Sequence, residues 1–277
     1  MGEGAQESLS DVELARETEV TQGRYAYCII SGAGEMSLGN IGIEHAEAYS
    51  ISHKDIAAVV HACQSKPYES RDENKVKEWI LSHNNVIDKA SERFGTVLPF
   101  SFDAIVKGDD DAVKDWLSKG YEKFKKELER LRDKAEYTVQ IFCDQNRLTD
   151  KIVGENQGLR ELKEKIEKMP KRAAYLLHRK FELQVKDIYN VMRVKLAEEF
   201  SSKIKEHVEE VKVEEKISHV PESYKDKKLI AAFSCLVHKE KVKSLGEVLG
   251  KINSQEGYAV RFTGPWAPFS FVNMEEI

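Results

Sequence analysis

The chain has 277 residues, which suffices for two domains of ordinary size or one large domain. Its 43 lysines and arginines stand against 48 aspartates and glutamates, so the formal net charge is −5. This balance disfavours a nucleic-acid-binding protein, which needs surplus basic residues facing the phosphates. No segment approaches the run of about 20 apolar residues that crosses a membrane as a helix, so we expect no membrane span.

The start of the chain and its cysteines indicate a cellular compartment. Residues 1–22 are polar and acidic, without the apolar stretch of a signal peptide, and we expect them to form a flexible lead-in. The four cysteines lie far apart and never form a CxxC pair. Such spacing is typical of a reducing compartment, where cysteine serves as a small apolar residue, and it predicts a cytoplasmic protein.

The first half of the chain contains short strand patterns and two helical patterns. Strands are expected at residues 24–31, 46–52, 55–63 and 96–102, and Pro99 requires the last one to lie at a sheet edge or a bulge. Between residues 72 and 94 apolar residues recur every three or four positions, which predicts an amphipathic helix. Its apolar stripe consists of Val76, Trp79, Ile80, His83, Ile87, Ala90 and Phe94. A second helix is expected to begin at the acidic residues 109–111, which complement a helix N-terminus.

The second half of the chain is dominated by a long helical pattern. A strand at 137–143 precedes residues 148–211, which are helical in pattern and broken by Pro170. The longest helix there carries an apolar stripe from Leu177 to Val208, which must pack on another surface. A charged loop, a strand at 229–238, a helix at 239–252 and a strand from residue 257 follow. Each half thus has a strand–helix–strand unit ending in PFSF, and this faint repeat predicts two α+β modules.

Sequence motifs for catalysis or cofactor binding are absent. The GAGE segment at residues 32–35 lacks the third glycine and the helix of a dinucleotide-binding loop, and no P-loop or GxSxG motif occurs. Two pairs of soft ligands, His61 with Cys63 and Cys235 with His238, lie in apolar strands at irregular spacing, which favours core positions over zinc ligands. We therefore expect a protein that is not an enzyme, with no catalytic, cofactor-binding or metal-binding residues.

The most specific string is RFTGPWAPFSFV at residues 261–272, where two prolines fix the backbone and large aromatic side chains cluster. It resembles the TGPWPPYSFV signature of the GvpF/GvpL family of gas vesicle proteins. The matching residues are Phe262, Thr263, Gly264, Pro265, Trp266, Pro268, Phe269 and Phe271. YAYCII, DIAAVV and FGTVLPFSF also resemble family segments, and the last contains Thr96, Val97, Leu98, Pro99 and Phe100. The chain has APF where the family often has PPY, and FSFDAIV where Arg-Phe-Gly-Thr is usual, which leaves the F type and the L type open.

The resemblance covers nearly the whole chain and implies an α+β fold of two ferredoxin-like variants. It places an N-terminal module at residues 23–134 and a C-terminal module at 135–277, with a long helical insert at about 148–211. It also implies an accessory or minor structural protein of gas vesicle formation. Such a protein binds the small hydrophobic shell protein, limits its aggregation and assists nucleation or assembly. The expected partners are the shell protein and other accessory proteins, and the expected location is the gas vesicle in the cytoplasm.

Two alternatives remain open. One is a small-molecule-binding or enzymatic α+β protein with a site between its modules. The other is a helical scaffold that binds other vesicle assembly factors through the stripe from Leu177 to Val208. For the contact with the shell protein, the N-terminal module is favoured because it is the simpler half with free strand edges. Within the C-terminal string, Trp266 and Phe271 are expected to pack in the core.

Overall fold

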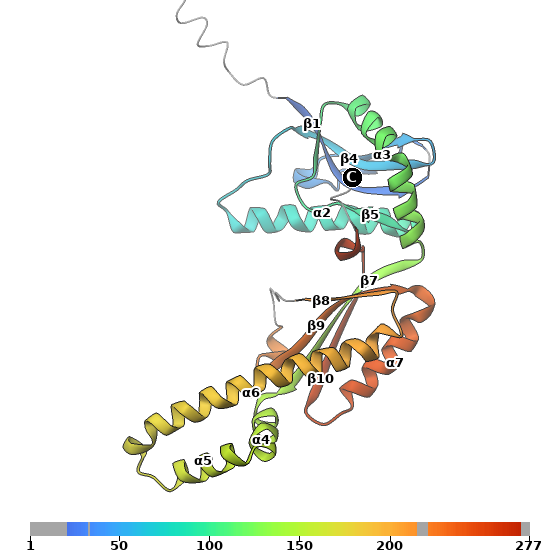
Figure 1. Ribbon diagram of the computed structural model, residues 1–277. Helices are drawn as coiled ribbons and strands as arrows, with labels where there is room; N and C mark the ends of the chain where they lie inside the picture. The colour runs from blue at the N-terminus through green and yellow to red at the C-terminus, as the bar shows by residue number, and fades with distance from the viewer. Residues whose placement is uncertain (1–20, 33, 215–220, 273–277) are drawn as a thin grey trace, which may run out of the picture. The chain divides into compact units, whose positions relative to one another are not determined.

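The computed structural model describes residues 21–32, 34–214 and 221–272 (Figure 1). The chain divides into two compact units, one containing the described residues up to Arg132 together with Val272, and the other spanning Asp133–Phe271. The sequence places this division two residues later, between residues 134 and 135. Residues 1–20 of the expected lead-in lie outside the described residues, and Gln22 already belongs to a strand. Both units contain helices and strands, which confirms the predicted mixed α and β fold.

The first unit is built on one antiparallel sheet. Its strands are β1 (Gln22–Ser31), β2 (Ser37–Gly39), β3 (Ala48–His53), β4 (Ile56–Gln64), β5 (Val97–Pro99) and β6 (Ile105–Lys107). They follow the order β2-β3-β4-β1-β5, and β6 pairs with β1 beside β5. β1 pairs with three strands, β4, β5 and β6, more than any other strand described in this sheet, and it is called the central strand below. A short 3₁₀ turn, η1 (Ile43–His45), precedes β3.

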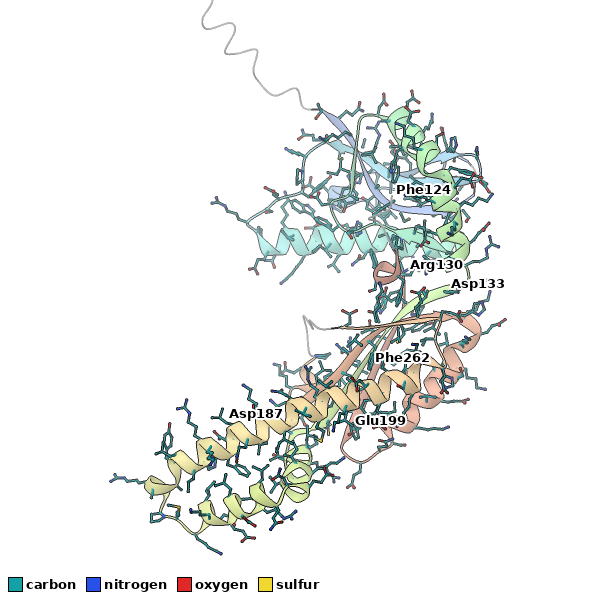
Figure 2. All side chains as sticks on the ribbon, viewed as in Figure 1. Phe124, Arg130, Asp133, Asp187, Glu199 and Phe262 are labelled. Atoms are coloured by element: carbon teal, nitrogen blue, oxygen red, sulfur yellow. The ribbon has the colours of Figure 1, made fainter. Side chains whose placement is uncertain are left out.

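Two helices cover the sheet, and both begin where the sequence predicts. Helix α2 (Glu73–Phe94) is capped by the side chain of Asp72, and α3 (Asp110–Leu131) is capped by Asp109. Gly95 ends α2 with a φ of 81°, a conformation that favours glycine. On the α3 side, Phe124 is fully buried (Figure 2). The sequence pattern therefore located both helices correctly.

Both faces of β1 are buried because the two helices pack on opposite sides of the sheet. Tyr25 on one face donates to His83 of α2, with an O···N distance of 2.9 Å. Arg24 on the other face bonds Asp110 at the start of α3, with an N···O distance of 2.5 Å. Burial alone would raise the pKa of Asp110, but hydrogen bonds from Arg24 and Tyr49 outweigh it and lower that pKa. The first unit is thus a three-layer arrangement of helix, sheet and helix.

Two details of the first unit differ from the expected pattern. The predicted strand at 96–102 is only three residues long, because the chain turns after Pro99. Pro99 does lie in an edge strand, where its missing N–H breaks no ladder. Ile80 belongs to the predicted apolar stripe of α2, yet 40% of its surface is exposed. The stripe is therefore narrower than predicted and centres on Trp79, His83, Val86, Ile87 and Ala90.

The second unit contains another antiparallel sheet, with the strand order β10-β7-β9-β8. Its strands are β7 (Lys134–Asp144), β8 (Glu210–Val213), β9 (Lys227–His238) and β10 (Tyr258–Trp266). Its helices are α4 (Gln145–Glu155), α5 (Gln157–Glu167), α6 (Lys171–Lys205) and α7 (Val242–Asn253). Short 3₁₀ turns η2 (Glu222–Tyr224), η3 (Lys239–Lys241) and η4 (Phe269–Phe271) complete the unit. Here β7 is the central strand, between β9 and β10.

One hydrophobic core joins one face of this sheet to its helices. It contains Val139 and Ile141 of β7, Phe233 of β9, Phe200 of α6 and Leu245 of α7. Helix α5 packs on the N-terminal half of α6, and the two helices run side by side away from the sheet (Figure 1). The helical region ends earlier than the sequence suggests, because α6 stops at Lys205 and Val211 lies in β8. The alternation of Glu210, Val211, Lys212 and Val213 is a strand period that the preceding helix pattern hides.

The packing of α6 predicts opposite outcomes for two of its apolar side chains. Phe200 is 1% exposed and lies in the core, so Phe200→Ala should lower the free energy of unfolding by about 3–5 kcal/mol. Leu176 is 75% exposed, so Leu176→Ala should change the free energy of unfolding by less than about 0.5 kcal/mol. Urea unfolding of both variants measures these changes. Equal losses would contradict this orientation of the helix.

Candidate interaction site at the C-terminal aromatic corner

The aromatic corner, residues 262–271, is formed where β10 leaves the sheet. The pairing of β10 with β7 is irregular between Thr263 and Trp266, and the Gly264–Pro265 peptide bond is cis. Gly264 has a φ of +133°, and a Cβ there would lie 2.7 Å from Cδ1 of Tyr137 and 2.9 Å from the carbonyl oxygen of Glu136. Only glycine therefore allows this close approach of the corner to β7.

Part of the corner is packing surface. The ring of Phe262 stacks on Tyr137 with centroids 5.1 Å apart, and it contacts the hydrophobic core of the second unit (Figure 2). Ala267 and Phe271 are buried, with 7% and 3% of their surface exposed. The structure therefore agrees with the expectation that Phe271 is a packed residue.

A carboxylate holds the end of the corner on the sheet. Ser270 donates both its N–H and its hydroxyl to Glu136 of β7, with distances of 2.8 and 2.6 Å. Lys212 of β8 donates to the carbonyl oxygen of Ser270 at 2.5 Å. Glu136 is only 7% exposed, so its charge requires these bonds. Sequence reasoning missed Glu136, and its only signal was an acidic residue directly before the predicted apolar strand.

The remaining aromatic side chains of the corner face outward. Trp266 is 48% exposed and Phe269 is 39% exposed. Trp266 thus departs from the expectation of core packing, because Gly264 and Pro265 interrupt the strand and leave the last residues of β10 exposed. The corner therefore combines a buried anchor with two partly exposed aromatic rings at the end of an edge strand.

Replacing Gly264 tests how rigidly the corner is held. Gly264→Ala should lower the free energy of unfolding by about 1–3 kcal/mol, because the new Cβ meets Tyr137 and backbone and the φ is strained for other residues. Gly246→Ala in α7 is a matched control, since a Cβ there has nothing within 4 Å. Chemical denaturation compares the two variants, and an equally stable Gly264→Ala protein would contradict the close approach.

The family segment of the first unit, residues 96–100, is packed in the interior and is not an exposed surface. Val97, Leu98, Pro99 and Phe100 are all buried, and Thr96 is half-buried. The N–H of Phe100 donates to the carbonyl oxygen of Tyr27 at 2.9 Å, and its ring lies 5.5 Å from that of Trp116. These residues join β5 to β1 and α3. These family-motif residues are therefore packing residues of the first unit and not an exposed surface.

Two buried histidines of the first unit belong to a closed hydrogen-bond network. The hydroxyl of Tyr27 accepts the N–H of Ile43 and is hydrogen-bonded to Nδ1 of His61 at 2.7 Å, and Nε2 of His61 is hydrogen-bonded to the hydroxyl of Tyr68 at 2.9 Å. His83 repeats this pattern, since its Nδ1 accepts from Tyr25 and its Nε2 donates to the carbonyl oxygen of Phe100. Both ring nitrogens of each imidazole thus have a hydrogen-bond partner, and His61 has no nitrogen free to bind a metal.

These histidines make the stability of the first unit depend on pH. Burial lowers the pKa of His61 and of His83 to about 4, from 6.5. Between these pH values the unfolded chain binds more protons than the folded chain, so the free energy of unfolding should fall as the pH drops from about 6.5 to about 4. Each histidine contributes up to about 3 kcal/mol to this loss.

Urea unfolding at pH 7 and at pH 4.5 measures this effect. The double variant His61→Gln/His83→Gln should show a smaller difference between the two pH values. Leu81→Ala alters an exposed side chain that carries no titratable group and should leave the difference unchanged. An undiminished pH dependence in the double variant would show that other groups cause it.

The described residues contain no cluster of three or more histidine, cysteine or acidic side chains that could hold a metal ion. Burial raises the pKa of all four cysteine thiols, and that of Cys235 reaches about 12, so none resembles an activated nucleophile. In the part of the chain that the structure describes, no helix is both long enough and apolar enough to cross a bilayer.

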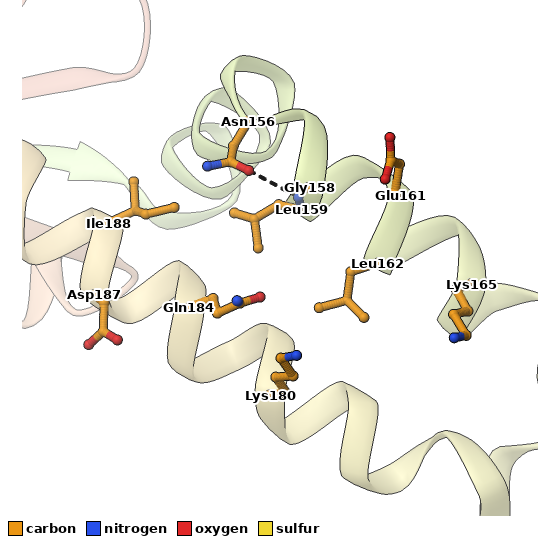
Figure 3. A pocket seen from close by; sticks show the side chains of 10 residues that line it. All are labelled: Asn156, Gly158, Leu159, Glu161, Leu162, Lys165, Lys180, Gln184, Asp187 and Ile188. Atoms are coloured by element: carbon orange, nitrogen blue, oxygen red, sulfur yellow. Dashed lines mark hydrogen bonds between the residues drawn. The ribbon is translucent and has the colours of Figure 1, made fainter.

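A groove of about 490 Å³ lies between α5 and α6 (Figure 3). Leu159, Leu162 and Ile188 line it, and charged side chains such as Lys165 and Lys180 surround it. Asn156 caps α5 there by accepting the N–H of Leu159. The charged residues are exposed and come from two helix surfaces, which does not resemble a catalytic constellation.

Comparisons with known proteins now give the family. The family model described as gas vesicle synthesis protein GvpL/GvpF matches residues 23–273. The chain therefore belongs to the GvpL/GvpF family of gas vesicle synthesis proteins. The motif residues of the aromatic corner lie within the matched range.

Individual relatives agree with this assignment. The chain is 29% identical to gas vesicle protein L1 of Halobacterium salinarum, with 92% of each chain covered. It is 28% identical to gas vesicle protein L of Haloferax mediterranei, with 96% of this chain and 92% of the relative covered. The crystal structure of GvpF from an Anabaena species matches with a TM-score of 0.69 at 17% identity, covering 92% of this chain and 99% of that one. This likeness shows a shared fold.

Proposed function

We propose that this protein binds the small hydrophobic shell protein of gas vesicles, limits its aggregation and assists the nucleation or assembly of the vesicle. Family membership supports the gas vesicle context. The observation that carries the proposal is the pair of partly exposed aromatic rings, Trp266 and Phe269, on a corner that Gly264 and Glu136 hold in place. Exposed aromatic side chains on a rigid support are typical of protein-binding surfaces.

The physical need for such a partner follows from the chemistry of the shell protein. A subunit that polymerises through apolar surface is prone to aggregate before assembly. A partner that offers a small apolar surface can cover part of it, and the net charge of −5 helps to keep the complex in solution. The protein would act in the cytoplasm, at the gas vesicle, by binding and not by catalysis. Other accessory proteins of the vesicle are further partners in this proposal.

The strand edges favour the corner over the first unit as the main contact. The edge strands β2 and β5 of the first sheet are only three residues long, and β5 contains Pro99. Such short edges are poor templates for an added strand. By contrast, β10 is a nine-residue edge strand, and Trp266 lies at its end. This argument replaces the expectation, drawn from the sequence, that the N-terminal module makes the main contact.

We also propose that both units are ferredoxin-like variants. The second unit has the order strand, helices, strand, strand, helix, strand, which is the βαββαβ order of that fold with α4–α6 in place of its first helix. In the first unit β4 and β5 lie on either side of β1, and α2 connects them along the chain. In the second unit β9 and β10 lie on either side of β7 in the same way, and α7 connects them. These modules correspond to residues 23–134 and 135–277, with the helical insert in the second.

Substitution of the exposed aromatic pair tests the proposed contact. In a sedimentation assay that follows how much purified shell protein stays in solution, Trp266→Ala/Phe269→Ala should lower the affinity about 30-fold. Leu81→Ala in α2 removes a side chain that is 68% exposed and should have no effect. Circular dichroism and unfolding curves of each variant establish that it is folded.

Unchanged protection of the shell protein by the folded double variant would contradict the corner as the contact. Protection that is lost equally in Leu81→Ala would indicate non-specific apolar contact. A protein that never binds the shell protein, with or without the substitutions, would overturn the proposed function itself.

A further inference from the structure

Helix α6 has two apolar faces, of which only one is covered. The face that bears Phe181, Ile188 and Met192 packs toward the core of the second unit. Outside that face Leu176, Leu183, Val191 and Val194 are 75%, 55%, 61% and 53% exposed, Val194 borders a hollow shared with β8 and β9, and Asp187 lies in the same sector as Leu176. Leu176, Leu183 and Val194 lie within about 20° of one another around the helix axis and span about 27 Å along it. The stripe from Leu177 to Val208, expected as the scaffold surface, is therefore the inner face.

A column of basic residues runs beside the exposed face. Arg172, Arg179, Lys186 and Arg193 follow one another at seven-residue intervals, and all four are exposed. Residues seven apart lie two turns apart on nearly the same side of a helix. None of the four forms an ion pair with a carboxylate among the residues described. Between residues 172 and 195 the helix has only two acidic residues, Glu182 and Asp187, although the whole chain is acidic.

We propose that this outer face of α6 docks an amphipathic helix of a partner protein, one whose apolar stripe is flanked by acidic residues. Leucines and valines on α6 would pack against that stripe, and the basic column would face its carboxylates. The charge pattern favours an acidic partner, because four exposed cations along one side of an apolar stripe attract carboxylates and repel a basic surface. This surface is separate from the aromatic corner and goes beyond the proposed contact with the shell protein.

Two other occupants fit the face less well. A helix that lies on an anionic membrane has a wide apolar face with basic residues along both sides. Here α5 occupies one side of α6, and the groove between the two helices includes Asp187. A second copy of the same face would bring two basic columns together, which disfavours self-association.

A pair of synthetic peptides tests the proposal on the full-length protein. Both are helices of three heptads with leucine at the a and d positions. One peptide carries glutamate at the e and g positions, and the other carries lysine there. The glutamate peptide should bind the wild-type protein at least about tenfold more tightly than the lysine peptide. Arg172→Glu/Arg179→Glu/Lys186→Glu should reverse this preference, and Leu176→Ala/Leu183→Ala should weaken binding of the glutamate peptide. Fluorescence anisotropy of labelled peptides measures each affinity.

Lys119→Glu/Lys123→Glu/Lys126→Glu is the matched control, because it makes the same change of charge at exposed positions of α3. It should keep the wild-type preference. Equal binding of the two peptides, or equal effects of the two triple variants, would overturn the proposal. The proposal would also be overturned if the wild-type protein bound phosphatidylserine vesicles but did not bind the glutamate peptide. Dimerisation in analytical ultracentrifugation that Leu176→Ala/Leu183→Ala abolishes would overturn it in favour of a second copy.

Discussion

Each sheet depends on a central strand that is paired along both edges. In the first unit β1 pairs with β4 on one side and with β5 and β6 on the other, and in the second unit β7 lies between β9 and β10. A polar side chain on such a strand must find a partner, because water does not reach it. Tyr25 meets this requirement through His83, and Glu136 meets it through Ser270. The position of the aromatic corner follows from β7, since both Gly264 and Ser270 are placed against it.

The sequence predicted those parts of the fold that depend on neighbours along the chain. Helix starts at Asp72 and Asp109 and the edge position of Pro99 follow from local chemistry. The bond between Glu136 and Ser270 joins residues 134 positions apart, and no local pattern reports it. Trp266 is exposed because of where β10 ends relative to β7. The amino-acid sequence around Trp266 does not contain this information. The resemblance at residues 261–272 gave the family, but it did not show which of its side chains face solvent.

Helix α6 illustrates a second limit of pattern reading. Its inner apolar stripe matches the helical period closely. The sequence pattern therefore does not distinguish Leu176, Leu183 and Val194, which lie between the stripe residues, as a second apolar set. A helix of 35 residues extends past the sheet, and the added length provides a surface that the core does not use. The insert that distinguishes the second unit from a plain βαββαβ fold therefore adds surface rather than core.

The short edge strands of the first sheet have a consequence for the protein itself. In the proposed contact with polymerising subunits, a long free strand edge is a place where a subunit can add a strand. With three residues in β2 and three in β5, the first unit gives an incoming chain too few backbone groups to extend its own sheet. Strand addition is thereby favoured at the second unit, whose edge strand β10 is nine residues long and ends at the proposed contact.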